Sequence, residues 1–136
     1  EIDKAYYRSI KKGKDVTLDD GTVVKNELLT GPPAPIKSYA FCSDTAYLPS
    51  ITEQIKKVTA LYHESTFLDT HLHLCKATKH STAKQAAQIA NKAEVKQLIL
   101  GHYSTRYDSI NLFKEEAQIY FENVVLAEDG KTISFN

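Results

Sequence analysis

Three ionisable side chains stand at or just after the ends of short apolar runs. Asp44 follows "KSYAFCS", Glu64 ends "VTALYHE", and His102 follows "VKQLILG". Carboxylate oxygens and imidazole nitrogens are zinc ligands, and a carboxylate at a strand end can bridge two zinc ions. The structural alternatives are an Asp that caps a turn and a lone His with no ligand. The repeated placement indicates a site to which several strands contribute.

A further candidate, His80, directly precedes a segment whose alanines recur at helical spacing. This segment, residues 81–93, predicts an amphipathic helix that packs closely on a sheet. A helix N-terminus favours an anion because of its free N–H groups and its positive dipole end. His80 is therefore a candidate general acid or phosphate ligand, and Glu64 is a candidate for orienting it. The alternative is an ordinary capping turn with an incidental His.

Hydroxyl groups and a guanidinium follow His102 closely in the stretch "YSTRY". Arg106 offers a forked pair of donors that matches a phosphate, and Ser104 and Tyr107 add hydroxyls beside it. This group predicts contact with a phosphate.

The apolar runs that carry these residues alternate with helical patterns from residue 37 onward. Such alternation predicts an α/β fold, and layered sheets collect functional groups at the carboxyl ends of their strands. Before that point, "VTLDDGTVV" predicts a hairpin and "TGPPAP" a stiff extended linker. We therefore expect a single partial domain, with a hairpin and proline-rich linker at 1–37 and the α/β part at 37–136.

Composition narrows the class of protein. The 17 Lys and Arg balance the 17 Asp and Glu, so any contact with a polyanion must come from a local site. The two Cys residues have no CxxC spacing, which favours a reducing, cytoplasmic setting. No apolar run approaches the roughly 20 residues of a membrane helix. The sequence contains no Met and starts at Glu1, so we expect a processed chain or a piece of a longer one.

Four segments taken together resemble ribonuclease Z, the tRNA 3′-processing endonuclease of the metallo-β-lactamase fold. They are "LDDGTVVKNELLTGPPAPIKSYAFCSDTAY", "LYHESTF", "KHSTAKQAAQIANKAEVKQLILGHYSTRY" and "FENVVLAEDGKTISF", and they occur in the family's order without large gaps. The resemblance runs from about residue 13 to the end and implies the C-terminal half of that enzyme. It implies half of an αββα sandwich, with a mixed sheet and helices packed on one face.

The resemblance also implies roles for the candidate residues. Asp44 matches the metal-bridging carboxylate, and His102 matches the last metal-binding histidine. Glu64 and His80 match catalytic residues beside the scissile phosphate, where His80 stabilises or protonates the leaving oxygen. The residues that match a segment near RNA phosphate are Ser104, Arg106 and Tyr107.

One departure from the family pattern concerns the metal ligands. The family's "HxHxDH" motif, which supplies most of the zinc ligands, is absent from these 136 residues. "HLHLCK" at 71–76 imitates its first half only, and we predict that His71 and His73 belong to a solvated connecting segment. With only Asp44 and His102 matched, we expect the chain alone to bind zinc weakly and to be inactive.

The sequence thus predicts part of a zinc-dependent endoribonuclease that removes the 3′ trailer from tRNA precursors, with two zinc ions in the complete enzyme. One alternative is another phosphodiesterase or arylsulfatase-like hydrolase of the same fold that acts on a small substrate. The other is a non-catalytic α/β binding module in which Asp44 and His102 only cap strands. Half of a sandwich exposes one face of its sheet, which predicts a homodimer or a domain-swapped assembly.

Overall fold

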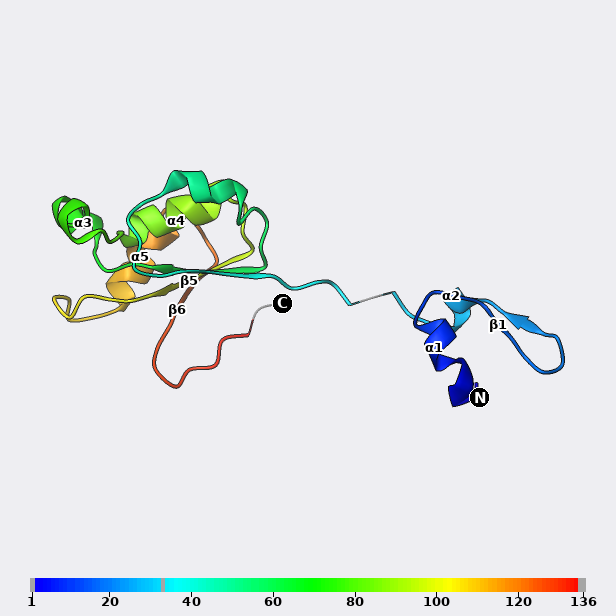
Figure 1. Cartoon of the computed structure of the whole chain (residues 1–136). Helices are drawn as coiled ribbons and strands as arrows, with labels where there is room; N and C mark the ends of the chain where they lie inside the picture. Colours follow the sequence, from blue (N-terminus) through cyan, green and yellow to red (C-terminus); the bar gives the residue numbers. More distant parts are fainter. Residues whose placement is uncertain (1, 33, 135–136) are drawn as a thin grey trace. The chain divides into compact units, whose positions relative to one another are not determined.

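The computed structural model of the chain describes residues 2–32 and 34–134. It divides into two compact units, Glu1–Ile36 and Lys37–Asn136, and each is described by itself (Figure 1).

The first unit is small and is built around a hairpin. Strands β1 (Val16–Thr17) and β2 (Val23–Val24) pair antiparallel, and Gly21 adopts a φ of 83° in the turn between them. Such a left-handed conformation suits glycine because it has no Cβ. The short helical elements of this unit are η1 (Lys4–Tyr6), α1 (Tyr7–Ile10) and α2 (Asn26–Leu29).

The second unit contains a four-stranded sheet in the order β3-β4-β5-β6. Its strands are β3 (Tyr39–Cys42), β4 (Ala60–Glu64), β5 (Gln97–Gly101) and β6 (Val124–Leu126). All three neighbouring pairs are parallel. The α/β class expected from the sequence is confirmed, but this sheet is wholly parallel in the described residues rather than mixed. Parallel neighbours require a crossover, and the segments between these strands supply it.

The crossover segments contain the helices of the second unit. They are η2 (Pro49–Glu53), η3 (Asp69–His71), α3 (Leu72–Thr78), α4 (Ala83–Lys92) and α5 (Asn111–Gln118). Helix α4 begins after Thr82, whose side chain accepts from the Gln85 N–H while the Gln85 side chain accepts from the Thr82 N–H. This capping box satisfies two donors at the helix start.

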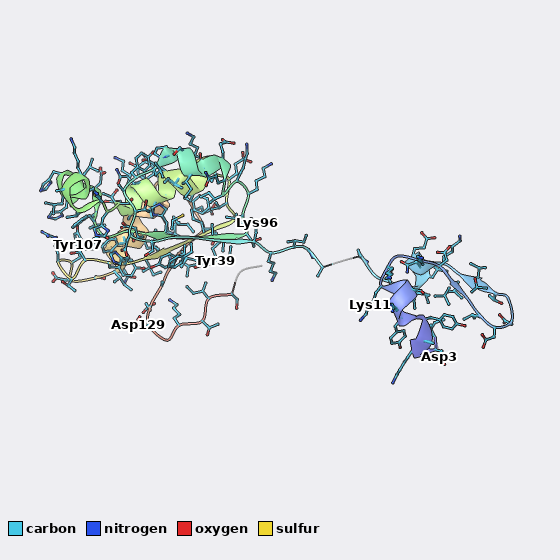
Figure 2. All side chains as sticks on the ribbon, in the orientation of Figure 1. Asp3, Lys11, Tyr39, Lys96, Tyr107 and Asp129 are labelled. Atoms are coloured by element: carbon cyan, nitrogen blue, oxygen red, sulfur yellow. The ribbon has the colours of Figure 1, made fainter. Side chains whose placement is uncertain are left out.

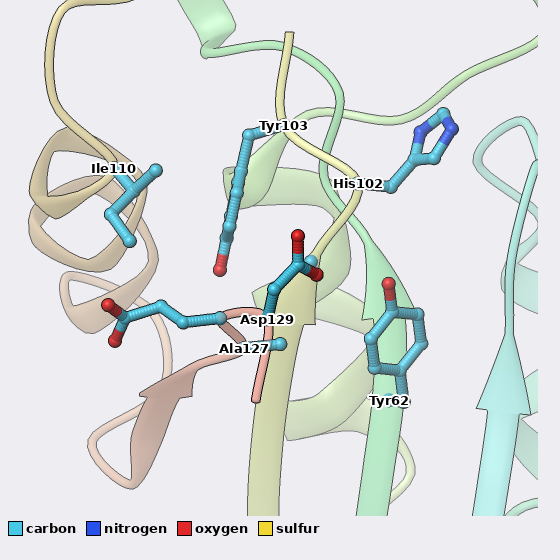
Figure 3. Close-up of a pocket in the computed structure, with 8 residues that line it drawn as sticks. Tyr62, His102, Tyr103, Ile110, Ala127 and Asp129 are labelled. Atoms are coloured by element: carbon cyan, nitrogen blue, oxygen red, sulfur yellow. The ribbon is translucent and has the colours of Figure 1, made fainter. Parts of the chain in front are cut away.

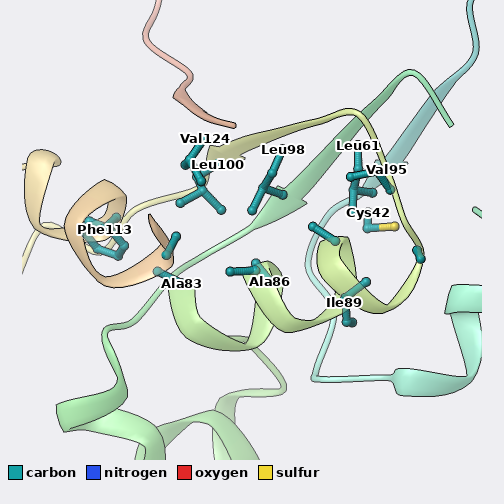
Figure 4. Close-up of a cluster of buried hydrophobic side chains, with 14 of the residues drawn as sticks. Cys42, Leu61, Ala83, Ala86, Ile89, Val95, Leu98, Leu100, Phe113 and Val124 are labelled. Carbon is teal, nitrogen blue, oxygen red and sulfur yellow. The ribbon is translucent and has the colours of Figure 1, made fainter. Parts of the chain in front are cut away.

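Helices α4 and α5 pack against the same face of the sheet, where the core lies (Figure 4). The α4 positions that meet the sheet are mostly alanines, so the helix backbone lies close to it. Phe113 of α5 is fully buried beside Leu98 and Leu100 of β5. None of the helices in the described ranges combines the length and apolar character that a membrane span requires.

The other face of the sheet, which we call the open face, carries the aromatic side chains of Tyr39, Phe41 and Tyr62, of which the first two are exposed and Tyr62 is half-buried. Side chains alternate along a strand, so Tyr39 and Phe41 point away from the core that Cys42 joins. They are 51% and 62% exposed, and Tyr39 is labelled in Figure 2. Phe41 stacks on Tyr62 with ring centroids 4.6 Å apart. The Tyr62 ring covers Gly101, so a Cβ at the end of β5 would require that ring to shift.

Candidate metal and phosphate site

The carboxyl ends of the parallel strands bring the predicted residues together. Asp44 lies two residues beyond β3, Glu64 ends β4, and His102 directly follows β5. Because parallel strands end at the same edge of a sheet, these side chains meet there. Asp44 Oδ1 lies 3.0 Å from His102 Nε2, and both side chains reach solvent, 69% and 42% exposed respectively.

Both residues of this pair adopt an unusual backbone conformation. The φ angles are 47° at Asp44 and 60° at His102, in the left-handed region. For a residue with a Cβ this costs roughly 1–2 kcal/mol, and Asp tolerates it better than His does. The conformation turns the chain sharply at each strand end.

Glu64 lies behind this pair as a buried hydrogen-bond acceptor. Its side chain has no exposed surface. Oε1 accepts from the Thr45 N–H at 3.1 Å and lies 2.8 Å from His80 Nδ1. Oε2 accepts from the Thr66 N–H at 3.0 Å and from the Thr66 hydroxyl at 2.8 Å. A buried carboxylate with four donors is well satisfied, and it holds His80 without reaching a substrate itself.

The Thr66 hydroxyl determines which nitrogen of His102 carries a proton. Its oxygen lies 2.8 Å from both Glu64 Oε2 and His102 Nδ1. A carboxylate only accepts, so the single hydroxyl proton goes to Glu64, and His102 Nδ1–H donates to Thr66. In the neutral ring Nε2 then has a lone pair directed at Asp44 Oδ1, another acceptor. Two acceptors 3.0 Å apart require a cation between them, either a proton or a metal ion.

His80 adds a third donor atom to this cluster. Its Nδ1 faces the Glu64 carboxylate, which leaves Nε2 as the lone-pair nitrogen of the neutral ring. The ligand atoms of Asp44, His80 and His102 all lie within 4.8 Å of one another. The rings of His80 and His102 are tilted by 34°, with centroids 5.1 Å apart. The cluster fits a metal ion, because each ring is held through its other nitrogen, as imidazole ligands commonly are.

Backbone hydrogen bonds join the two loops that carry Glu64 and His80. Phe67 N–H donates to the Ser81 carbonyl at 3.2 Å, and Ala83 N–H donates to the Phe67 carbonyl at 2.9 Å. The Ser81 hydroxyl also donates to the Thr45 carbonyl at 2.7 Å. Since Thr45 follows Asp44, direct hydrogen bonds hold together the segments that carry Asp44, Glu64 and His80.

The three residues after β5 that the sequence predicts to bind phosphate, Ser104, Arg106 and Tyr107, have different surroundings in the structure. Arg106 is exposed, its guanidinium lies 5.7 Å from the centre of the Phe67 ring, and no ion pair engages it among the described residues. Ser104 is tied to the site through its N–H, which donates to the Thr66 carbonyl at 3.1 Å. Contact of these two residues with a phosphate stays a prediction.

Tyr107 forms hydrogen bonds within the chain through its hydroxyl. Its hydroxyl accepts from the Leu68 N–H at 2.9 Å and donates to His71 Nδ1 at 2.9 Å. Both bonds engage that oxygen, so Tyr107 anchors the start of the segment containing α3, and its contact with phosphate stays a prediction. His71 Nδ1 is thus engaged by the Tyr107 hydroxyl, whereas the His73 side chain is exposed on α3.

Sequence reasoning missed Thr45 and Thr66. Threonine is neither a usual metal ligand nor a general acid, so the residue type did not indicate a role for either position. A usable signal was the spacing of Thr66, because a hydroxyl two residues after a buried Glu can bond back to its carboxylate, as in an Asx-like turn.

The fold is that of the metallo-β-lactamase proteins, although no family model matches the sequence. A metallo-beta-lactamase fold protein from Bacillus subtilis superposes with a TM-score of 0.64 at 21% identity, covering 70% of this chain and 39% of that one. A long-form RNase Z from yeast superposes with a TM-score of 0.59 at 24% identity, covering 67% of this chain and 12% of that one.

Curated relatives named Ribonuclease Z confirm the resemblance drawn from the sequence. The protein from Bacteroides thetaiotaomicron is 48% identical over 127 residues, which is 93% of this chain and 40% of that protein. The one from Porphyromonas gingivalis is 44% identical over 132 residues, which is 97% of this chain and 43% of that protein. This chain therefore spans about 40% of the length of the relatives it matches.

Proposed function

We propose that this chain forms part of a zinc-dependent endoribonuclease that removes the 3′ trailer from tRNA precursors by hydrolysing a phosphodiester. Two lines support the proposal: relatives named Ribonuclease Z at 48% and 44% identity, and the site at the strand ends. The single observation that carries it is the meeting of Asp44, His80 and His102 at the strand ends, where their ligand atoms all lie within 4.8 Å of one another.

Asp44 and His102 are the metal ligands in this proposal. When bound, zinc supplies positive charge that polarises a phosphoryl oxygen and lowers the pKa of water. Thr66 keeps the His102 lone pair directed at the ion by accepting from Nδ1. Asp44 is the more exposed of the two ligands, so it can reach a second ion as well.

His80 acts on the leaving oxygen as general acid, and Glu64 is its positioning residue. The buried carboxylate, 2.8 Å from Nδ1, stabilises the positive charge that the ring gains on protonation. Arg106 and Ser104 bind the phosphate from the loop after β5.

Three donor groups are too few to enclose two zinc ions, which take about four ligands each. We therefore propose that protein outside these residues completes the site and that the 136 residues alone do not cut RNA. We also propose that the isolated chain forms a homodimer in which a second copy covers the open face. Among the described residues β3 lies at the edge of the sheet and carries Tyr39 and Phe41, so a single two-fold contact covers this edge strand and the open face together.

Metal binding is tested first, by calorimetric titration of the chain with zinc chloride. Asp44→Ala and His102→Ala are expected to weaken binding at least about tenfold, and His80→Ala much less. Glu122→Ala is the matched control, because Glu122 is exposed and precedes β6 at the other edge of the sheet. Equal zinc binding by wild type and Asp44→Ala would overturn the ligand assignment.

Cleavage is tested in a chimera in which this chain replaces its matched 127-residue segment of the Bacteroides thetaiotaomicron protein. We expect the chimera to cut a labelled tRNA precursor at the 3′ trailer, the Asp44→Ala version to be inactive, and the Glu122→Ala version to be unaffected. A chimera that hydrolyses only a small aryl phosphodiester would favour the alternative hydrolase. Full activity in the Asp44→Ala version would favour a binding module.

A further inference from the structure

A pocket of about 280 Å³ lies beside the site, between α3 and the loop that follows Asp44. Tyr47 comes from that loop and Leu72 and Lys76 come from α3, while His80 and Gln85 belong to the start of the α4 segment. His80 belongs both to this pocket and to the Asp44–His80–His102 cluster. A molecule that reaches the cluster therefore has this pocket as its immediate neighbour.

The lining of the pocket combines apolar surface with positive charge. Tyr47 and Leu72 are among the exposed large hydrophobic side chains of the chain. Lys76 supplies a cation, and none of the described residues that line the pocket is acidic. Gln85 accepts from the Thr82 N–H through Oε1, which leaves its NH₂ group as a donor. An aromatic surface, a cation and an amide donor are the groups that bind an unstacked nucleotide.

A larger cavity, which His102 lines, has the opposite character. It measures about 580 Å³ and is lined by Tyr62, Tyr103 and the carboxylates of Glu128 and Asp129 (Figure 3). Burial raises the pKa of Tyr103, so its hydroxyl keeps its proton. Two carboxylates repel a phosphate, so an RNA strand is favoured on the Tyr47 side of the cluster and disfavoured on this one.

We infer that the Tyr47 pocket binds the nucleoside that carries the leaving oxygen, with its base stacked on Tyr47 and its 5′-phosphate paired with Lys76. The inference rests on the proposed function, in which His80 donates a proton to that oxygen. His80 then faces the 3′-oxygen of the nucleoside in the pocket, and the phosphate on the far side of the ribose reaches Lys76. The pocket is a substrate subsite and takes no part in metal binding.

Several hydrogen bonds hold the walls of this pocket in place. The Thr45 carbonyl accepts from Ser81, which ties the Tyr47 loop to the α4 segment. Tyr107 and Leu68 anchor the start of the α3 segment, and the His80 N–H donates to the Cys75 carbonyl at its end at 3.3 Å. Cys75 is buried at the back of the pocket, and burial raises the pKa of its thiol. A neutral thiol adds no negative charge that would oppose a nucleotide.

The test is a titration of the isotope-labelled chain with adenosine 5′-monophosphate, followed by the amide resonances of Ala46, Tyr47 and Gln85. No metal is needed. Tyr47→Ala is expected to weaken binding about tenfold, to the level of ribose 5-phosphate, because the stacking surface is lost. Tyr47→Phe should bind as wild type does. Lys76→Ala should reduce binding of the nucleotide to that of adenosine, which has no phosphate.

Two variants serve as matched controls. Tyr7→Ala removes another exposed tyrosine, from the first unit, and Lys92→Ala removes another exposed lysine, from the end of α4. Neither should alter binding. The inference is overturned if the nucleotide leaves these resonances unshifted at about 10 mM, or if Tyr47→Ala binds as tightly as Tyr47→Phe. Either result leaves the proposed function intact. If instead the zinc titration and the cleavage assay fail, the proposed function is overturned while nucleotide binding in this pocket stays the same.

Discussion

The Thr66 hydroxyl and the His102 ring are joined by a 2.8 Å hydrogen bond in which the ring is the donor. The direction follows from Glu64, which takes the only hydroxyl proton that Thr66 has. A buried carboxylate thus sets the proton position of a ring that it does not touch. This arrangement keeps the His102 lone pair toward Asp44, which is why we assign the pair to a metal.

The first prediction concerns this hydroxyl. Thr66→Val should weaken zinc binding about tenfold while keeping the shape of the side chain, because His102 Nδ1 loses its acceptor. Thr66→Ser keeps the hydroxyl and should bind zinc as wild type does. The measurement is the same calorimetric titration. Equal affinities for the valine and serine variants would show that Thr66 does not orient the ring.

The second prediction concerns pH and the buried His63, which is 1% exposed. Burial lowers its pKa, against smaller opposing effects from the Glu64 carbonyl and carboxylate. The unfolded chain therefore binds the proton more readily than the folded one. The resulting stability is fully present above the ordinary His pKa of about 6.5 and is lost as the pH falls below it.

His63→Asn removes this titration and keeps a donor near the Glu64 carbonyl, which His63 Nδ1 reaches at 2.7 Å. Urea unfolding of both proteins between about pH 7.5 and pH 5 measures the effect. The gap in unfolding free energy between wild type and variant should shrink on acidification. His80 and His102 are present in both proteins, so their titration cancels in the comparison. A difference in unfolding free energy that stays constant with pH would show that burial does not keep His63 neutral in the folded chain.

The third prediction uses the left-handed conformation of Lys79, the residue that ends α3, with a φ of 59°. Glycine has no Cβ to strain there, so Lys79→Gly should stabilise the chain by about 0.5 kcal/mol despite the added freedom of the unfolded state. Lys76→Gly is the matched control inside α3 and should destabilise by about 1 kcal/mol. Thermal or urea unfolding measures both, and effects of the same sign would contradict the explanation.

The fourth prediction concerns the open face. The isolated chain should sediment as a dimer, and Phe41→Glu should shift it to monomer, because a charge then occupies a side chain that is 62% exposed in one copy. Ile119→Glu is the control, since Ile119 is 75% exposed but lies at the end of α5. A wild-type chain that stays monomeric at high concentration would count against the dimer.

Much of the fold was predictable because it depends on local patterns. The apolar runs before Asp44 and His102 predict strands, and the regular alanines after Thr82 predict a helix pressed against a sheet. The mixed sheet was expected from the resemblance, whereas the four strands described in the second unit are all parallel. Strand direction depends on pairing between distant segments, which local patterns do not contain.

The sequence by itself determined which ionisable groups stand at strand ends, because strand periodicity and the residue that follows each strand are read within a few positions. It also determined the likeness to ribonuclease Z, which depends on the order of short motifs. Only the tertiary structure decided what each group does. It buried Glu64 behind His80, gave Thr66 control of the His102 proton, and engaged the Tyr107 hydroxyl in structural bonds. Hydrogen bonds between segments 36 residues apart, such as Thr66 and His102, settle proton positions, and no local pattern encodes them.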